Sequence, residues 1–195
     1  MRFWSSISLV ALLMATAVLA QAPASVPSKP PAANRKVNEL TLAALRPGRD
    51  FAARAVQLYR KPDVENSTDA TQLGWSDVCR KETLTLDTDA EKRIQVIRTA
   101  GMGQFVGGCE KIPARPWKTG RGLRVNDPAP RVVQLYGEPD SRSPSTKDGR
   151  KLELLYYAFD WAGADVPQVM EVLCTVEDDG KTGRVVEITL AAPSL

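Results

Sequence analysis

Histidine is absent from the 195 residues. Its absence excludes imidazole acid–base catalysis, imidazole metal ligands and every histidine-containing triad. Cysteine is scarce, with three residues, and the charges nearly balance, with 26 Lys and Arg against 23 Asp and Glu. The net charge of +3 is too small to indicate a nucleic acid or an anionic membrane as partner. We therefore predict no catalytic residue, no metal site and no cofactor.

Only one long apolar run is present, from Ile7 to Ala20. Arg2 precedes it and small residues end it, which is typical of a secretion signal cleaved after Ala20. An uncleaved anchor is the alternative, but a spanning helix needs roughly 20 apolar residues. No cysteine follows the run, so a bacterial lipid anchor lacks its attachment residue. We expect residues 1–20 to be a signal peptide and the protein to be periplasmic or extracellular, without a stable membrane anchor.

Export makes a disulfide possible. The three cysteines are Cys79, Cys109 and Cys174, so at most one internal pair can form. Cys79 and Cys109 lie in the same half of the chain, and we expect them to pair, with Cys174 a buried thiol in an apolar strand. A Cys109–Cys174 pair is the alternative, and it would join the two halves.

A segment rich in Pro, Ala and Ser follows the apolar run and covers residues 21–40. Such a composition cannot bury enough apolar area to offset the chain entropy that folding costs. We expect a disordered tether there.

The remainder of the chain contains one motif twice. Val56-Gln57-Leu58-Tyr59-Arg60-Lys61-Pro62-Asp63 recurs as Val133-Gln134-Leu135-Tyr136-Gly137-Glu138-Pro139-Asp140, always 77 residues later. A constant offset of this size indicates duplication of one structural unit. We predict repeat unit 1 over residues 41–114 and repeat unit 2 over residues 115–195.

Each unit reads as a short helix followed by antiparallel strands. In both, an aspartate that can cap a helix, Asp50 or Asp127, precedes apolar residues at helical spacing, and the proline of the motif ends the helix. Alternating residues predict paired strands over 81–86, 93–98, 151–161, 169–176 and 184–190. The polar residues before Gly149 read as a loop. The predicted fold class is α+β, with two duplicated units, each a short helical segment packed on an antiparallel β-sheet meander.

The strand predicted over 151–161 is apolar on both faces. One face carries Leu152, Leu154, Tyr156 and Ala158, and the other carries Leu155, Tyr157, Phe159 and Trp161. A sheet with a helix on one side should be polar on the other, whereas an exposed aromatic face has the composition of a protein-binding surface. We predict a partner-binding face formed by Trp75, Tyr157, Phe159 and Trp161. The alternative is that the other unit, or Val166-Pro167, covers this face and makes it a core between the units.

The repeated motif carries a resemblance. Three features carry it: a helix that ends in Leu58-Tyr59-Arg60-Lys61-Pro62-Asp63, an aromatic strand, and a hairpin whose two strands are joined by Asp178-Asp179-Gly180. Together these features resemble one family. It comprises the β-lactamase inhibitor protein repeats and the small lipoprotein of the outer-membrane β-barrel assembly machinery. The resemblance covers residues of about 42–190, and the tandem order is closer to the inhibitor repeats. It implies a concave sheet face that binds a protein, although Arg60 stands where the motif has glycine.

Together these observations predict an exported, monomeric or weakly associating, non-catalytic module that binds an unidentified protein. The alternatives are a structural component of cell-envelope assembly and a small hydrolase that uses acidic residues. A basic cluster beside Trp117 has residue types that hold nucleic acids or other polyanions: Arg115, Lys118, Arg121 and Arg124. Without a wider basic field we interpret this cluster as a solvated linker, and we predict no nucleic-acid partner.

Overall fold

The computed structural model describes residues 36–65, 71–102, 115–159, 169–177 and 182–192. All described residues belong to one compact unit. The predicted signal peptide and the first fifteen residues of the predicted tether lie outside the described residues.

The described residues form the order helix, four strands, helix, four strands. The helices are α1 (Ala52–Tyr59) and α2 (Pro130–Tyr136). The strands are β1 (Val64–Glu65), β2 (Gln72–Asp77), β3 (Glu82–Thr88), β4 (Ile94–Gly101), β5 (Ser141–Lys147), β6 (Arg150–Ala158), β7 (Val169–Val176) and β8 (Thr182–Ala191). The fold class is α+β, as predicted.

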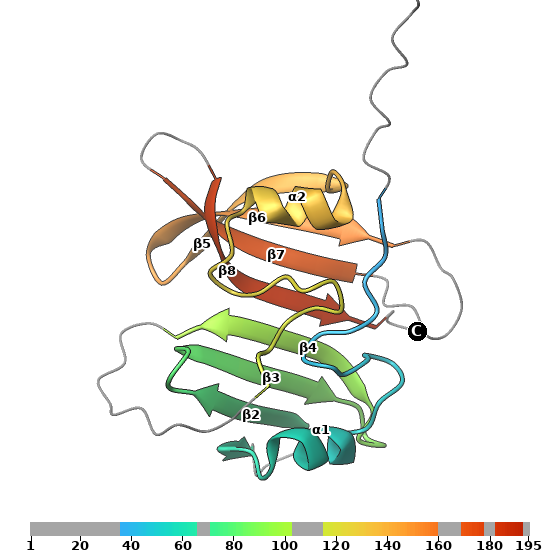
Figure 1. The fold of residues 1–195 in the computed structure, drawn as a ribbon. Helices are drawn as coiled ribbons and strands as arrows, with labels where there is room; N and C mark the ends of the chain where they lie inside the picture. Colours follow the sequence, from blue (N-terminus) through green and yellow to red (C-terminus); the bar gives the residue numbers. More distant parts are fainter. Residues whose placement is uncertain (1–35, 66–70, 103–114, 160–168, 178–181, 193–195) are drawn as a thin grey trace, which may run out of the picture. The chain divides into compact units, whose positions relative to one another are not determined.

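All eight strands belong to one antiparallel sheet in the order β1-β2-β3-β4-β8-β7-β6-β5 (Figure 1). The first four and the last four strands form two meanders. β4 pairs with β8 at the centre, from Val96 opposite Ala191 to Ala100 opposite Glu187. The two predicted repeat units therefore contribute one meander each to a shared sheet. Their pairing satisfies backbone N–H and C=O groups that two free edges would expose.

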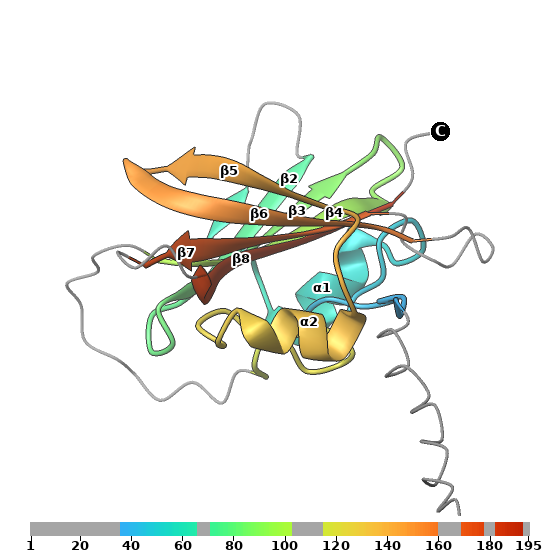
Figure 2. The same ribbon diagram turned by 90° about the horizontal axis from the view of Figure 1, so that it is seen from above.

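Both helices lie on the same side of the sheet (Figure 2). Alternate strand residues face them and form a single core with the helix residues Ala55 and Val132. The fully or almost fully buried strand residues include Leu84, Leu86, Ile97, Leu155, Tyr157, Val172, Ile188 and Leu190. No described element covers the other face of the sheet. The molecule therefore has two layers and one uncovered sheet face.

The helices lie where the spacing predicted them, but the predicted caps are wrong. No side chain caps the first turn of either helix. Each of the two aspartates instead accepts a backbone N–H from the preceding turn and pairs with the arginine four positions later. The contacts are Asp50 with Arg46 N–H (2.9 Å) and Arg54 Nε (3.5 Å), and Asp127 with Arg124 N–H (3.0 Å) and Arg131 Nε (3.2 Å). The carboxylates close the turn before the helix.

The two copies of the repeated motif make matching contacts. In each copy the motif aspartate bonds to the second strand of its meander, and an aromatic residue of that strand donates to the carbonyl oxygen of the residue after the helix. In the first copy the bonds are Asp63 N–H to Gly74 O (2.8 Å), Ser76 N–H to Asp63 Oδ2 (2.7 Å) and Trp75 Nε1 to Arg60 O (3.1 Å). In the second they are Asp140 N–H to Tyr156 O (2.9 Å), Ala158 N–H to Asp140 Oδ2 (2.6 Å) and the Tyr157 hydroxyl to Gly137 O (3.0 Å). The motif thus joins each helix to its sheet.

Residues 36–40, which the composition assigned to the tether, are held against the second half of the chain. Lys36 pairs with Asp140 at 2.8 Å, and the Val37 N–H donates to the Tyr136 carbonyl at 3.1 Å. Glu39 is 2% exposed. The predicted tether therefore does not extend over its last five residues, because specific polar contacts bind them to α2 and its neighbours.

Candidate functional site

The aromatic residues predicted to bind a partner belong to the core. Tyr157 is 0% exposed, and Trp75 and Phe159 are each 5% exposed. Trp75 and Tyr157 pack against the tyrosines that end α1 and α2, with ring centroids 6.1 and 6.0 Å apart. Buried rings cannot meet a partner, so the prediction of binding through these three residues is wrong. The fourth, Trp161, lies outside the described residues.

The opposite face of β6 is the uncovered one. The strand register places Leu154, Tyr156 and Ala158 of β6 beside Leu173 and Val169 of β7 on this face. All five residues are partly exposed, and we call them the apolar strip. On the first meander the same face is mainly polar, with Gln72, Ser76, Thr83, Thr85 and Asp87. It also carries Val96, Ala100 and Val64, of which Val64 is 59% exposed. The strand is indeed apolar on both faces, but the helices cover the more aromatic one.

An ion-pair network indicates that the uncovered face is concave over the second meander. Lys147 of β5 bonds to Glu187 of β8, although β6 and β7 lie between these strands. Neighbouring strands are about 4.8 Å apart, so in a flat sheet these side chains would not meet. Figure 2 shows the β5–β6 hairpin rising out of the sheet on the side away from the helices. Glu187 also pairs with Arg98 of β4 at 3.3 Å, so the same network joins the two meanders.

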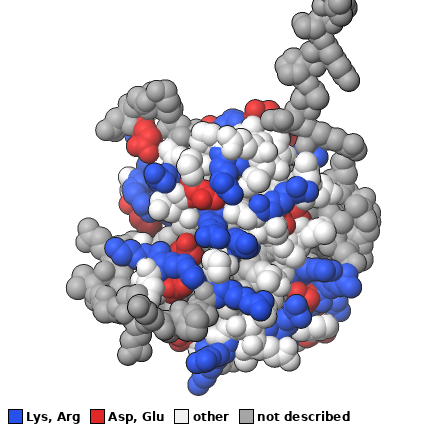
Figure 3. Space-filling model, viewed as in Figure 1, with Lys and Arg blue, Asp and Glu red and all other residues white. Residues whose placement is uncertain are grey.

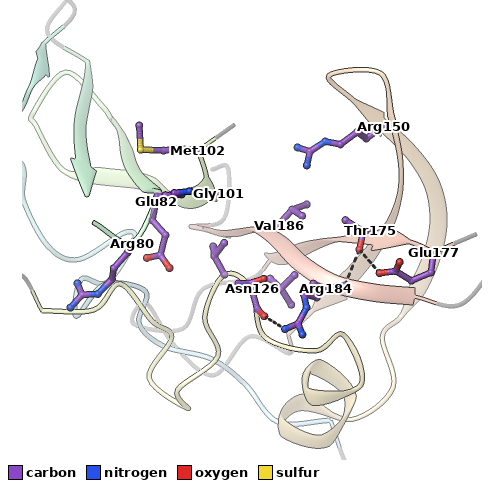
Figure 4. Close-up of a pocket in the computed structure, with 13 residues that line it drawn as sticks. Arg80, Glu82, Gly101, Met102, Asn126, Arg150, Thr175, Glu177, Arg184 and Val186 are labelled. Atoms are coloured by element: carbon purple, nitrogen blue, oxygen red, sulfur yellow. Dashed lines mark hydrogen bonds between the residues drawn. The ribbon is translucent and has the colours of Figure 1, made fainter. Parts of the chain in front are cut away.

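A cavity of about 450 Å³ lies where β4 and β8 separate (Figure 4). The two strands pair only as far as Ala100 opposite Glu187, while β8 continues to Thr182 along β7 alone. We call this cavity the seam pocket. Its lining comes from both meanders and the segment between them, and includes Glu82, Met102, Val125, Arg150, Arg184 and Val186.

Glu82 is the buried carboxylic acid of the seam pocket. It is 8% exposed, and among the described residues its carboxyl group has no hydrogen-bond or ion-pair partner. Burial, with smaller opposed effects of Arg80 and Asp77, raises the pKa of Glu82 from 4.5 to about 7. A cavity-lining acid with such a pKa is a candidate functional group. The sequence reasoning missed it, because Glu82 sits at the start of an ordinary alternating strand.

Comparisons with known proteins leave the function open. No family profile matches the chain, and no curated protein matches it. The fold is similar, with a TM-score of 0.47 and 12% identity, to a crystal structure of a DUF4309 family protein (YjgB) from Bacillus subtilis subsp. subtilis str. 168, over 80% of this chain and 88% of that one. It is similar, with a TM-score of 0.44 and 8% identity, to a cysteine-rich secretory protein (SAV1118) from Staphylococcus aureus subsp. aureus Mu50, over 81% of this chain and 48% of that one. This chain thus matches about half of the latter protein, and similarities this weak carry no functional inference.

The cysteines offer no nucleophile in the described part of the chain. Cys174 is a free, buried thiol on β7, and burial raises its pKa to about 12, so it stays protonated. The alternative Cys109–Cys174 disulfide is therefore wrong. Cys79 is disulfide-bonded. Its expected partner, Cys109, lies outside the described residues, so that pairing stays a prediction.

Other chemistry has no assembled site in the described ranges. No group of three or more Cys, Asp or Glu is placed there to hold a metal ion, and no helix there is long and apolar enough to cross a membrane. Two carboxylates line the seam pocket, Glu82 and Glu177. Figure 4 shows Glu177 on the far wall, turned toward Thr175, so the two do not face each other as the carboxyl pair of a glycoside hydrolase does.

The basic cluster of the sequence lies on the helix-covered side. It consists of Arg115, Lys118, Arg121 and Arg124. Figure 3 shows basic residues spread over this side with acidic residues among them. Trp117 is 3% exposed and packs against Tyr59 at 6.1 Å between ring centroids. The cluster therefore lacks the exposed ring on which nucleic-acid bases stack.

We expect Glu82→Gln to stabilise the protein at high pH. The unfolded chain releases the Glu82 proton near pH 4.5 and the folded chain near pH 7, so wild-type stability falls as the pH rises through this window. Because the cavity admits solvent, we expect a gain of about 1–2 kcal/mol for the variant at pH 8 and none at pH 4. Urea unfolding at the two pH values measures it.

The matched control is Glu177→Gln, which changes an exposed carboxylate of the same pocket and should leave stability unchanged at both pH values. A Glu82→Gln variant less stable than wild type at pH 8 would mean that a favourable interaction holds the ionised carboxylate.

Proposed function

We propose that this chain is an exported, non-catalytic protein-binding module that holds its partner on the concave, uncovered face of the second meander. The apolar strip is the observation that supports this proposal most directly. Its residues are partly exposed on a face that a two-layer fold should leave polar. Burying them against a partner would yield about 25 cal/mol per Å² of apolar surface. The resemblance to the inhibitor repeats stays a prediction and points to the same kind of face.

The charge beside the strip suggests the chemistry of the partner. Glu171 lies in register between Tyr156 of β6 and Thr189 of β8. No described residue forms an ion pair with its carboxylate. A cationic side chain from a partner would pair with Glu171 while lying over the Tyr156 ring. We therefore propose that the partner inserts a loop in which Lys or Arg is flanked by apolar residues.

We further propose that the sheet arose by duplication of one unit of a helix and four strands. The repeated motif, the mirrored strand order and the matching contacts of Asp63 and Asp140 support this history. On this view the two copies diverged on the uncovered face. The first is mainly polar there, and the second acquired the apolar strip.

Site-specific photo-crosslinking in the native host tests the binding face. A photoreactive residue at position 154 or 156 should crosslink to one and the same protein. The exposed control positions Gln57 on α1 and Thr146, which faces the helix side of β5, should not. The purified partner should then bind Tyr156→Ser and Glu171→Lys at least about tenfold more weakly than wild type by calorimetry, with Gln57→Ser unchanged. The same crosslink at the control positions, or unchanged affinity in both variants, would contradict the proposal.

A further inference from the structure

We propose that the seam pocket binds a short peptide with free ends, whose ammonium group lies at Glu82 and whose carboxylate lies at Arg184. The inference goes beyond the proposed partner-binding face, because no residue of the apolar strip lines the seam pocket.

The shape and lining of the cavity suit a small ligand. Its volume of about 450 Å³ falls within the range of known small-molecule sites, about 300–1,000 Å³. Val125, Val185, Val186 and Met102 supply apolar walls for side chains. Gly101 lies directly opposite Glu82 in the strand register, and a Cβ atom there would come within 3.5 Å of the Val125 side chain.

Glu82 lacks the partner that a buried carboxyl group requires. More than nine-tenths of the residue is buried, and its carboxyl group lines the cavity without a hydrogen bond or ion pair to any described residue. Partial removal of such a group from water without a partner makes its ionised form costly. A ligand ammonium would supply hydrogen-bond donors and a compensating charge together.

Arg184 offers the complementary group on the other side. One guanidinium N–H donates to the Asn126 carbonyl at 2.9 Å, and no described carboxylate pairs with the side chain. The remaining N–H groups form the fork that binds a carboxylate through two parallel hydrogen bonds. Arg150 adds a second cation to the same half of the lining.

The two groups come from different halves of the sheet. Figure 4 shows Glu82 on the β3–β4 side of the pocket and Arg184 on the β7–β8 side. A ligand with opposite charges at its two ends matches this arrangement. A short peptide has an ammonium group at one end and a carboxylate at the other, and its chain between them carries apolar side chains. A simple anion would leave Glu82 unpaired, and a simple amine would leave Arg184 unused.

Calorimetry with leucyl-leucine as probe tests the inference. The free dipeptide should bind at pH 7.5, whereas N-acetyl-leucyl-leucine and leucyl-leucine amide, which each lack one terminal charge, should bind at least about tenfold more weakly. Glu82→Gln and Arg184→Gln should each weaken binding of the free dipeptide to a similar extent. Lys151→Gln removes a charge from an exposed residue outside the pocket and should have no effect.

The pH dependence provides a second readout. The ammonium pairs with ionised Glu82, whose pKa is about 7, so wild-type affinity should be about tenfold higher at pH 7.5 than at pH 5.5. Glu82→Gln should show no such difference. The other charged groups that act on Glu82 are Arg80, Asp77, Arg124 and Asp127. Arginine and aspartate side chains ordinarily keep their charge throughout this range.

Three outcomes would overturn the inference. They are no binding of the free dipeptide, equal binding of the free and blocked forms, and tighter binding at pH 5.5 than at pH 7.5. None of them bears on the apolar strip, so the proposed partner-binding function would stand or fall separately.

Discussion

Replacing Tyr157 with alanine should lower the free energy of unfolding by about 3–5 kcal/mol, a large part of the stability of a typical domain. The Tyr157 side chain is fully buried, and its ring lies 6.0 Å from that of Tyr136 between centroids. Its hydroxyl donates to the Gly137 carbonyl at 3.0 Å. The substitution would leave a cavity between β6 and α2 and a carbonyl without its donor. Urea unfolding followed by tryptophan fluorescence measures the loss.

Tyr156→Ala is the matched control, because it removes the same side chain from the adjacent position on the uncovered face. Tyr156 is partly exposed, so its replacement should lower the free energy of unfolding by less than about 1 kcal/mol. Equal losses at the two positions would contradict the assignment of the faces. A Tyr157→Ala protein that keeps its stability but loses its partner would restore the binding role that the sequence predicted for this residue.

Glu39→Ala should lower the free energy of unfolding by about 3–5 kcal/mol, because this one buried carboxylate accepts hydrogen bonds from donors in three parts of the chain. Oε1 accepts the backbone N–H groups of Leu40 (2.9 Å), Thr41 (3.0 Å) and Gly120 (3.0 Å), and Oε2 accepts the Arg121 N–H (3.1 Å) and the Tyr136 hydroxyl (2.7 Å). Burial and the Glu39 charge raise the pKa of Tyr136 above its ordinary value, which keeps this hydroxyl a donor. The alanine variant would leave the Leu40, Thr41 and Arg121 N–H groups without this acceptor, whereas the Gly120 N–H keeps the Thr41 carbonyl (3.0 Å) and the Tyr136 hydroxyl keeps Thr119 Oγ1 (2.6 Å). Thermal and urea unfolding measure the cost.

Two further variants isolate the Glu39 network. Tyr136→Phe removes a single donor and should cost about 1–2 kcal/mol, while Glu91→Ala removes an exposed carboxylate and should cost almost nothing. A Glu39→Ala protein within 1 kcal/mol of wild type would show that water replaces the carboxylate and that the network does not hold the N-terminal segment.

Both proposed sites depend on the way the two meanders meet. Pairing of β4 with β8 over only part of their lengths leaves the seam pocket at one end. The Lys147–Glu187–Arg98 network links the curled β5–β6 hairpin to this same seam. Neither feature exists within one meander alone, so a single copy of the repeat would lack the seam pocket.

The polar strand β5 shows why part of the sheet could not be predicted. Ser141–Lys147 has no alternation of apolar and polar residues, and it read as a loop. It is a strand because its backbone pairs with β6 along its whole length. As an edge strand it has few side chains to bury, and Pro144 is tolerated there because one side of the strand needs no ladder bonds. Hydrophobic periodicity carries no signal for such an element.

The strand β6 shows a different limit. Its pattern correctly indicates two apolar faces, but a period of two contains no information on which face meets the helices. The register of β6 with β7, and the attachment of α2 through Asp140 and Gly137, turn Leu155 and Tyr157 inward and Tyr156 outward. The residues first assigned to partner binding are therefore one position away from those that can reach a partner.

The sequence alone determined the two helices, most of the strands and the motif that repeats after 77 residues. These features follow from the spacing of apolar residues and from turn residues, which influence only a few neighbouring positions. The sequence also excluded histidine chemistry outright. Only the tertiary structure decided that β4 and β8 merge the meanders into one sheet, which face is covered, and that Glu82 lines a cavity without a partner. These features depend on contacts between residues that are distant in the chain. The free energy of such long-range contacts is not reflected in the local hydrophobic periodicity of the sequence.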